Sequence, residues 1–208
     1  MLSDSIISGI DNALRTLTGN SRGSGRPNPS TGQKDSLLRP LDRQQAGRMM
    51  RVNHAGEVMA QALYTGQAAG TDDPALRETL LTARREEEDH LRWCEDRLRE
   101  LGSHPSLLGP IWYATAWAMG YAAARHGRGS NLGLVVAVEN LVEEHLKEHL
   151  DGLPAEDRRS RSILEQMQAD ETCHARNAEH LGAASMPVPV RIALRGFSRV
   201  MTRGALWI

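Results

Sequence analysis

The feature of this sequence that most restricts its fold is a succession of helical patterns, each ended by glycine or proline. After residue 41, apolar residues recur every three or four positions, and breakers such as GTDDP, HGRGSN and GAASMP interrupt the pattern. No stretch alternates apolar and polar residues as a strand would. The sequence therefore predicts an all-α bundle. Its helices are expected at 42–69, 73–101, 106–126, 131–151, 156–182 and 190–207.

The predicted bundle, residues 41–185, has flanking segments of different character. Residues 1–17 form an amphipathic segment whose apolar face is made by Ile6, Ile7, Ile10, Leu14 and Leu17. Residues 18–40 are rich in glycine, proline, serine and threonine and are predicted to be a flexible linker. Residues 186–208 form a basic amphipathic tail.

Composition and local patterns exclude several classes of protein. The net charge of −1 gives no overall field that would attract nucleic acid. The densest apolar run, IWYATAWAMGYAAA, has 14 residues, fewer than the roughly 20 that cross a bilayer, so no transmembrane helix is expected. The first residues lack the pattern of a signal peptide. Two distant cysteines, Cys94 and Cys173, exclude a disulfide framework and indicate a reducing compartment.

Two predicted helices carry a glutamate and a histidine where their apolar faces require hydrophobic residues. Glu87 and His90 interrupt the inward face of 73–101, and Glu171 and His174 interrupt that of 156–182. A charged run such as EEED, residues 86–89, is ordinarily a solvated helix face. The helical register, however, places only its second glutamate inward. The other acids, Glu86, Glu88 and Asp89, are predicted to point outward or to flank the site.

Two further helices each place one glutamate inward, Glu57 and Glu139. A lone buried carboxylate costs several kcal/mol unless it is paired or neutralised. Four carboxylates and two imidazoles converging in one bundle would suit two divalent iron or manganese ions, and the set matches that of di-iron carboxylate bundles. A metal-free helical scaffold would leave these six polar residues without compensation.

Four segments of the chain stand out: RVNHAGEVMAQALYTGQ (51–67), EEEDHL (86–91), VAVENLVEEHLKEH (136–149) and DETCHA (170–175). They resemble the signature segments of the demethoxyubiquinone hydroxylase family, the ferritin-like di-iron monooxygenases of ubiquinone biosynthesis. The resemblance covers roughly residues 40–185. It implies a ferritin-like four-helix bundle with extra amphipathic helices and no transmembrane span.

The resemblance also implies the cofactor and its ligands. Two iron ions per chain would be bound by Glu57, Glu87, His90, Glu139, Glu171 and His174. The family pattern implies that Glu87 and Glu139 are shared between the irons, and that His145 lies just outside the ligands. Some members have a tyrosine where this chain has Leu146, so the resemblance carries no aromatic role to that position.

The implied reaction is hydroxylation of a polyprenyl methoxy-methyl-benzoquinol with O2 and two electrons, which NADH or the quinol itself would supply. The resemblance implies a peripheral protein on the cytoplasmic face of a bacterial inner membrane, with accessory lipid-presenting or ubiquinone-biosynthesis partners. Its tail carries four arginines at four-residue spacing: Arg191, Arg195, Arg199 and Arg203. This pattern predicts a helix on an anionic membrane surface, or one that packs on the bundle with its arginines outward.

Two rival functions use the same ligand set. A ferritin-like iron-storage or peroxidase protein would form a cage or carry an added cysteine cluster, and two distant cysteines exclude that cluster. A di-iron tRNA hydroxylase would prefer a basic face near the site, whereas the arginines here gather in the tail. The apolar stretch 106–126 predicts either core packing or the wall of a substrate channel.

Overall fold

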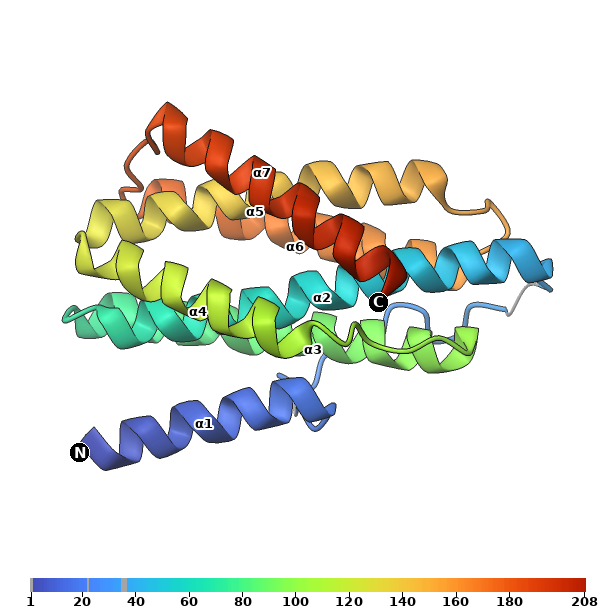
Figure 1. Cartoon of the computed structure of the whole chain (residues 1–208), viewed down its shortest axis with the longest axis horizontal. Coiled ribbons are helices and arrows are strands. Elements are labelled where there is room, and N and C mark those ends of the chain that lie inside the picture. The colour runs from blue at the N-terminus through green and yellow to red at the C-terminus, as the bar shows by residue number, and fades with distance from the viewer. Residues whose placement is uncertain (1, 22, 35–36) are drawn as a thin grey trace.

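The computed structural model describes residues 2–21, 23–34 and 37–208, with the backbone alone for residues 2–8. This part of the chain forms helices and no strand (Figure 1), which confirms the predicted all-α fold. Among the described residues, no helix has the length and apolar character needed to cross a membrane. The helices are α1 (Leu2–Thr18), α2 (Pro40–Gly70), α3 (Pro74–Leu101), α4 (Gly109–Arg125), α5 (Arg128–Gly152), α6 (Arg158–His180) and α7 (Val188–Trp207).

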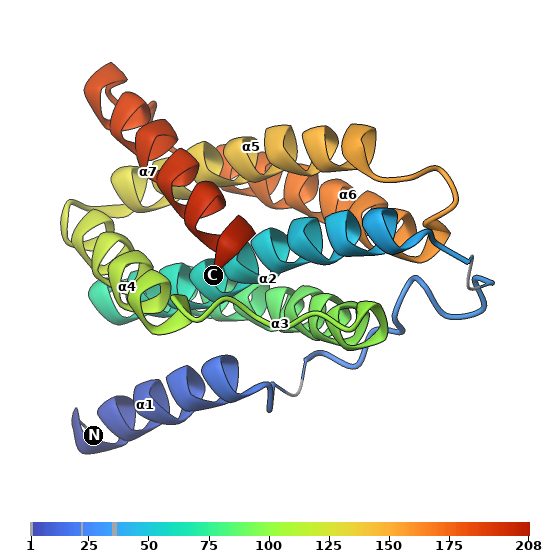
Figure 2. The same cartoon turned by 45° about the vertical axis from the view of Figure 1, so that its right-hand side comes forward.

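Four long helices form the centre of the molecule. The α2 and α3 helices pack as one pair and α5 and α6 as another, and the two pairs lie against each other (Figures 1 and 2). Local sequence explains the ends of α3. The Asp73 carboxylate accepts hydrogen bonds from the backbone N–H groups of Ala75 and Leu76, and Gly102 ends the helix with a φ of 68°.

The α4 helix packs unusually close to α2 because glycines lie at the contact. A Cβ on Gly66 would lie 2.1 Å from the carbonyl oxygen of Trp117, and one on Gly120 would lie 2.3 Å from that of Leu63. Neither position has room for a side chain. The close packing lets α4 cover one side of the bundle, where α7 also crosses (Figure 2).

The α1 helix lies along the edge of the bundle with its polar face inward. The side-chain amide of Asn12 donates hydrogen bonds to Thr65 and Tyr113 of the bundle. On the opposite face, Ile10 and Leu14 are 56% and 57% exposed. The predicted amphipathic character is present in the described part of α1, whereas the side chains of residues 6 and 7 lie outside the described residues.

The α7 helix crosses the outside of α2 and α5. Its inward residues Leu194, Met201 and Ala205 are buried against the bundle. Its arginines are all exposed, and one of them, Arg195, pairs with Glu144 of α5 at 2.9 Å. The tail therefore packs on its own bundle and keeps its basic face in solvent.

Candidate metal centre

The structure brings the six predicted metal-binding side chains together at the centre of the four-helix bundle. None of the six is more than 7% exposed. They form two overlapping groups, in each of which one donor atom per residue lies within 4.8 Å of the others. The groups are Glu57, Glu87, His90 and Glu171, and Glu87, Glu139, Glu171 and His174.

Glu87 and Glu171 belong to both groups, so they are the carboxylates that the two groups share. The family resemblance implied that Glu87 and Glu139 are shared, whereas in this geometry the shared pair is Glu87 and Glu171. Glu57 and Glu139 each belong to one group, at opposite ends of the cluster. The shared pair comes from the two Glu-x-x-His segments of α3 and α6, so the two segments face each other across the centre.

Both imidazoles point the same ring nitrogen into the carboxylates. His90 Nδ1 lies 3.0 Å from Glu87 Oε2, 3.4 Å from Glu171 Oε1 and 3.7 Å from Glu57 Oε2. His174 Nδ1 lies 2.9 Å from Glu87 Oε1 and 3.4 Å from Glu171 Oε2. The Nδ1 atoms are therefore the ones available to a metal, and the Nε2 atoms point away.

The cluster contains buried polar atoms that the protein does not satisfy. Glu57 Oε2, Glu87 Oε1, Glu171 Oε2 and His174 Nδ1 are buried and form no hydrogen bond of acceptable geometry, although His174 Nδ1 lies close to Glu87 Oε1. Native proteins rarely leave such atoms without a partner, and four in one cluster fit a site that binds a cation. Carboxylate oxygens and imidazole nitrogens are donors that suit iron or manganese, so the residues fit a metal pair.

The electrostatics of the cluster are those of a site that must hold protons or metal. Burial raises the pKa of the Glu57 and Glu139 carboxyls well above their ordinary value. Burial alone would lower the pKa of His90 and His174, but the surrounding carboxylates raise both. Burial would likewise raise the pKa of Glu87, but the two imidazoles hold it well below its usual range. Divalent ions would displace the protons bound here.

Each histidine is oriented by a carboxylate from the opposite helix. His90 Nε2 lies 2.9 Å from Asp170 Oδ2 of α6, and His174 Nε2 lies 2.8 Å from Glu86 Oε2 of α3. Such outer carboxylates fix the ring of a metal-binding histidine and its tautomer. Glu86 therefore flanks the site, as predicted, through a specific contact with His174. Asp170 directly precedes Glu171 in the sequence, but nothing in the sequence pattern indicated its contact.

Asp89 was predicted to point outward or to flank the site. It does not point into solvent, because its side chain is fully buried. Its carboxylate accepts hydrogen bonds from the backbone N–H and the hydroxyl of Ser24, a residue of the segment between α1 and α2. That segment covers this side of α3. A helical register calculated for α3 alone cannot reveal a cover supplied by a distant part of the chain.

A tyrosine that was not predicted as a site residue also contacts the cluster. Tyr64 of α2 is buried and donates a hydrogen bond of 2.6 Å to Glu139 Oε1. Its ring also meets the ring of His174 edge to face, with centroids 6.4 Å apart. The spacing of seven residues from Glu57, two helical turns, was the signal that could have found it.

Comparison with known proteins agrees with this geometry. The family model for ubiquinone biosynthesis protein COQ7 matches residues 44–207, most of the chain. The chain belongs to the COQ7 family. The match includes all six residues of the cluster and begins after the segment that joins α1 to α2.

Curated relatives of this COQ7-family chain are named 3-demethoxyubiquinol 3-hydroxylase. The one from Paracidovorax citrulli is 49% identical over 97% of this chain and 98% of its own length. The one from Cupriavidus pinatubonensis is 50% identical, with the same coverage of both chains. The one from Bordetella parapertussis is 48% identical over 99% of this chain and 92% of its own.

The RVNHAGE segment of the COQ7-family chain has a structural role at most of its positions. Arg51 donates a hydrogen bond of 2.9 Å to the carbonyl oxygen of His104, in the loop before α4. Asn53 Oδ1 lies 2.9 Å from Nδ1 of His149 on α5. Glu57, at the end of the segment, enters the metal cluster. The segment therefore joins α2 to its neighbours around the site.

His145, predicted to lie just outside the ligands, belongs to neither metal group. Its ring packs against that of His149, with centroids 3.9 Å apart, and burial lowers the pKa of both. The next residue, Leu146, is buried in the core beside α3 and α6. His145 instead lines a cavity.

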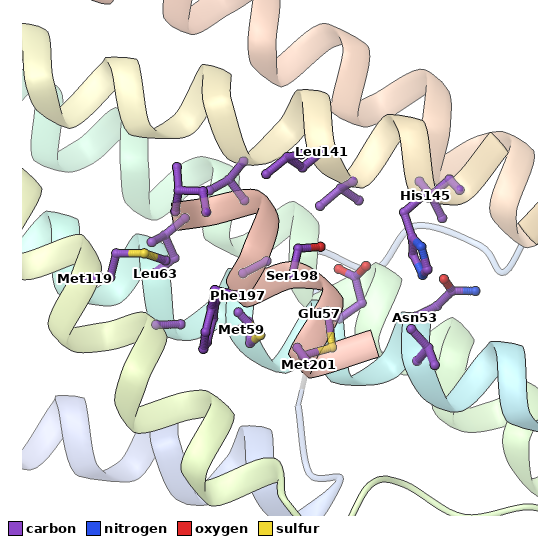
Figure 3. Close-up of a pocket in the computed structure, with 18 residues that line it drawn as sticks. Asn53, Glu57, Met59, Leu63, Met119, Leu141, His145, Phe197, Ser198 and Met201 are labelled. Carbon is purple, nitrogen blue, oxygen red and sulfur yellow. The ribbon is translucent and has the colours of Figure 1, made fainter. Parts of the chain in front are cut away.

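This cavity, of about 80 Å³, lies between α2, α4, α5 and α7 of the COQ7-family bundle (Figure 3). Glu57 and His145 face it at one end (Figure 3), and Phe197 and Met201 of α7 close its outer side. Apart from Glu57 and His145, only Asn53 and Ser198 contribute polar side chains to a wall of apolar residues. A residue of the candidate metal cluster therefore borders an apolar cavity, and α4 lines this cavity as well as packing in the core.

Proposed function

We propose that this protein is a di-iron monooxygenase that hydroxylates the ring of demethoxyubiquinol, a polyprenyl methoxy-methyl-benzoquinol, in ubiquinone biosynthesis. The observation that carries the proposal is the pair of overlapping ligand groups, which share Glu87 and Glu171 beside an apolar cavity. The hydroxylase name of the relatives supports the same reaction and disfavours iron storage or tRNA modification.

The six side chains of the cluster would hold two ferrous ions, whose two electrons, with two protons, would allow one oxygen atom of O2 to enter a ring C–H bond and the other to leave as water. NADH or the quinol would then restore the ferrous state. The protein's own residues prepare this chemistry. Asp170 and Glu86 hold the two imidazoles in place, and Tyr64 holds one oxygen of Glu139. Because these partners fix the ligands beforehand, little reorganisation is needed during the reaction.

The cavity would bind the quinol ring with its reacting edge toward Glu57. Its apolar wall excludes water and suits the ring and the first part of a prenyl chain. His145, whose pKa burial lowers and whose Nε2 has no hydrogen-bond partner, would accept a proton from a quinol hydroxyl. His145→Gln is then expected to lower kcat at least tenfold and to leave iron binding unchanged; an unchanged kcat would contradict this role.

A polyprenyl substrate lies in a bilayer, and α7 supplies a surface that could meet one. The exposed arginines of α7 stand beside the exposed Ile192, Val200 and Trp207, while the inner face of the same helix closes the cavity. We therefore infer a peripheral protein at the cytoplasmic face of a bacterial membrane. The triple change R191E, R199E and R203E should abolish binding to anionic liposomes, since each cation contributes about 1 kcal/mol. Undiminished binding would contradict this surface.

The activity test uses the purified protein loaded with Fe(II) under anaerobic conditions, with demethoxyubiquinol in detergent micelles and 18O2. The expected product carries one labelled oxygen, identified by mass spectrometry. Parallel reactions with and without NADH identify the electron donor. Glu171→Gln should abolish the product, whereas Glu165→Gln, an exposed change on the same helix, should not. An iron-loaded protein that yields no labelled product would contradict the proposed function.

A further inference from the structure

The segment between α1 and α2 is fastened to the outside of α3. The backbone N–H of Gly23 donates a hydrogen bond of 3.0 Å to Glu88, and that of Ser24 donates one of 3.1 Å to Asp89. Gly23 adopts a φ of 66°, and a Cβ there would lie 2.2 Å from Asp89 Oδ1. Only glycine allows this approach. The segment lies outside the residues that match the COQ7 family model.

Three residues further on, Arg26 reaches the outer carboxylate of the metal centre. Arg26 Nη2 lies 2.6 Å from Asp170 Oδ2, the same oxygen that lies 2.9 Å from His90 Nε2. The other oxygen of Asp170 accepts a hydrogen bond of 3.0 Å from Gln166. An arginine of the N-terminal segment thus contacts the carboxylate that in turn contacts the imidazole of His90.

Arg26 also confines His90 from a second side. The guanidinium carbon of Arg26 lies 5.1 Å from the ring centroid of Trp93, within the range of a cation–π contact. The Trp93 ring in turn lies 5.3 Å from the ring of His90. Asp170 fixes the direction of the imidazole N–H and Trp93 limits tilting of the ring, so one arginine holds both neighbours of the imidazole.

We infer that Arg26 is a positioning residue of the metal centre, which holds His90 in its metal-binding orientation through Asp170 and Trp93. The inference rests on the proposed metal pair. It makes the N-terminal segment a part of the active site, where the sequence predicted a flexible linker. A charge-assisted pair to a carboxylate that is 18% exposed has the strength for this role.

The role concerns one of the two metal positions. His174 has Glu86 as its outer partner, and among the described residues no arginine of the N-terminal segment contacts Glu86, whose side chain is 42% exposed. Loss of Arg26 should therefore weaken the position next to His90 and spare the position next to His174. A general loss of stability would affect both positions alike.

The test titrates the metal-free, full-length protein with Co(II) and follows the visible absorbance of each binding step. Arg26→Gln should weaken one of two steps about tenfold and leave the other within twofold, because loss of outer partners weakens metal binding by about 10–100-fold. Arg26→Lys should restore part of the affinity. Lys34→Gln removes an exposed charge from the same segment and should change neither step.

Two further measurements separate positioning from stability. In the Co(II) protein, the ring N–H proton of His90 should exchange with water faster in Arg26→Gln, as followed by paramagnetic NMR, and that of His174 should not. Gly23→Ala, which displaces the segment, should give the same pattern. Wild-type protein that binds no metal would refute the proposed function and this role together. Two unchanged binding steps in a folded Arg26→Gln protein would refute this role alone.

Discussion

The two halves of the metal centre are built from the same short pattern but are supported differently. One half contains His90 and its outer partner Asp170, and the other contains His174 and its outer partner Glu86. On each of the helices α3 and α6, an acid–Glu-x-x-His segment supplies one shared glutamate and one histidine. The first acid of the segment contacts the histidine of the other helix. The inner geometry is thus nearly symmetric.

The support outside the pattern breaks this symmetry. Asp170 is largely buried and is held by both Arg26 and Gln166, whereas Glu86 is 42% exposed. Glu86 and His174 line a second hollow of about 110 Å³, which also includes the exposed Thr79. The difference teaches that a repeated motif can place the same donor side chains in both halves while their outer contacts and exposure differ.

The largest expected effect comes from the residue that both halves share. Glu87→Ala removes a carboxylate common to both groups and leaves the Nδ1 atoms of both imidazoles without their nearest carboxylate. We expect loss of both metals and of activity, measured as iron per chain after anaerobic loading. Glu165→Ala is the control. Retention of one metal would mean that the halves are independent.

The next largest effect is expected from substitution of the two outer acids, Asp170 and Glu86. Asp170→Asn should weaken one metal position by 10–100-fold, because the amide has no negative charge to hold Arg26 and to strengthen the hydrogen bond to His90. Glu86→Gln should weaken the other position less, since Glu86 is more exposed. Metal titration of both variants gives the ratio, and equal losses would contradict the inequality of the halves.

The pH response should be common to both halves, because each contains an acid whose pKa burial raises. Glu57 and Glu139 have pKa values above the unfolded value of 4.5, and those of the two ligand histidines lie above 6.5. A raised pKa stabilises the fold below the unfolded pKa, and this contribution is lost as pH rises through the folded pKa. The pKa values of His145 and His149 are lowered, so their contribution to the stability of the fold is already complete above pH 6.5 and does not change from there on.

Above pH 6.5 the melting temperature of the metal-free protein should therefore fall by several degrees as the pH rises toward 8.5. Metal binding removes the same protons, so the thermal shift that metal produces should grow over this range. Differential scanning calorimetry with and without Mn(II) measures both. A metal-free melting temperature that rises between these pH values would contradict the assigned burial.

The smallest expected effect lies in the His174 half alone. Tyr64→Phe removes the hydrogen bond to Glu139 and leaves a buried carboxylate oxygen without its donor. The free energy of unfolding of the metal-free protein should fall by about 1–3 kcal/mol in urea titrations. Tyr113→Phe, which loses a 3.3 Å contact with Asn12, should have a smaller effect. A larger loss of unfolding free energy in Tyr113→Phe than in Tyr64→Phe would contradict the assigned hydrogen bond between Tyr64 and Glu139.

Much of this arrangement could be predicted from local sequence. The periodicity of apolar residues gave the helices, because each helix buries one stripe against its neighbours. The same register separated Glu87 from the acids beside it in the EEED run. Inward polar residues on four helices predicted a shared centre, since lone buried carboxylates are too costly. The structure brings all six of these side chains together.

The remaining features depend on contacts between distant segments. Which glutamates the two groups share depends on how α3 and α6 face each other, and the shared residue is Glu171 where the resemblance implied Glu139. The burial of Asp89 depends on the N-terminal segment, whose composition resembles that of a linker. Hydrogen bonds of Asn12 turn the polar face of α1 inward. Helical periodicity contains none of this information.

The central claim, a pair of metals with unequal support, is tested most directly by anomalous diffraction from crystals of the Fe(II)-loaded protein. Two iron peaks per chain are predicted, both touching Glu87 and Glu171. One should lie next to Glu57 and His90 and the other next to Glu139 and His174, with lower occupancy or higher mobility at the second. A single peak, or a pair bridged by other residues, would contradict the account.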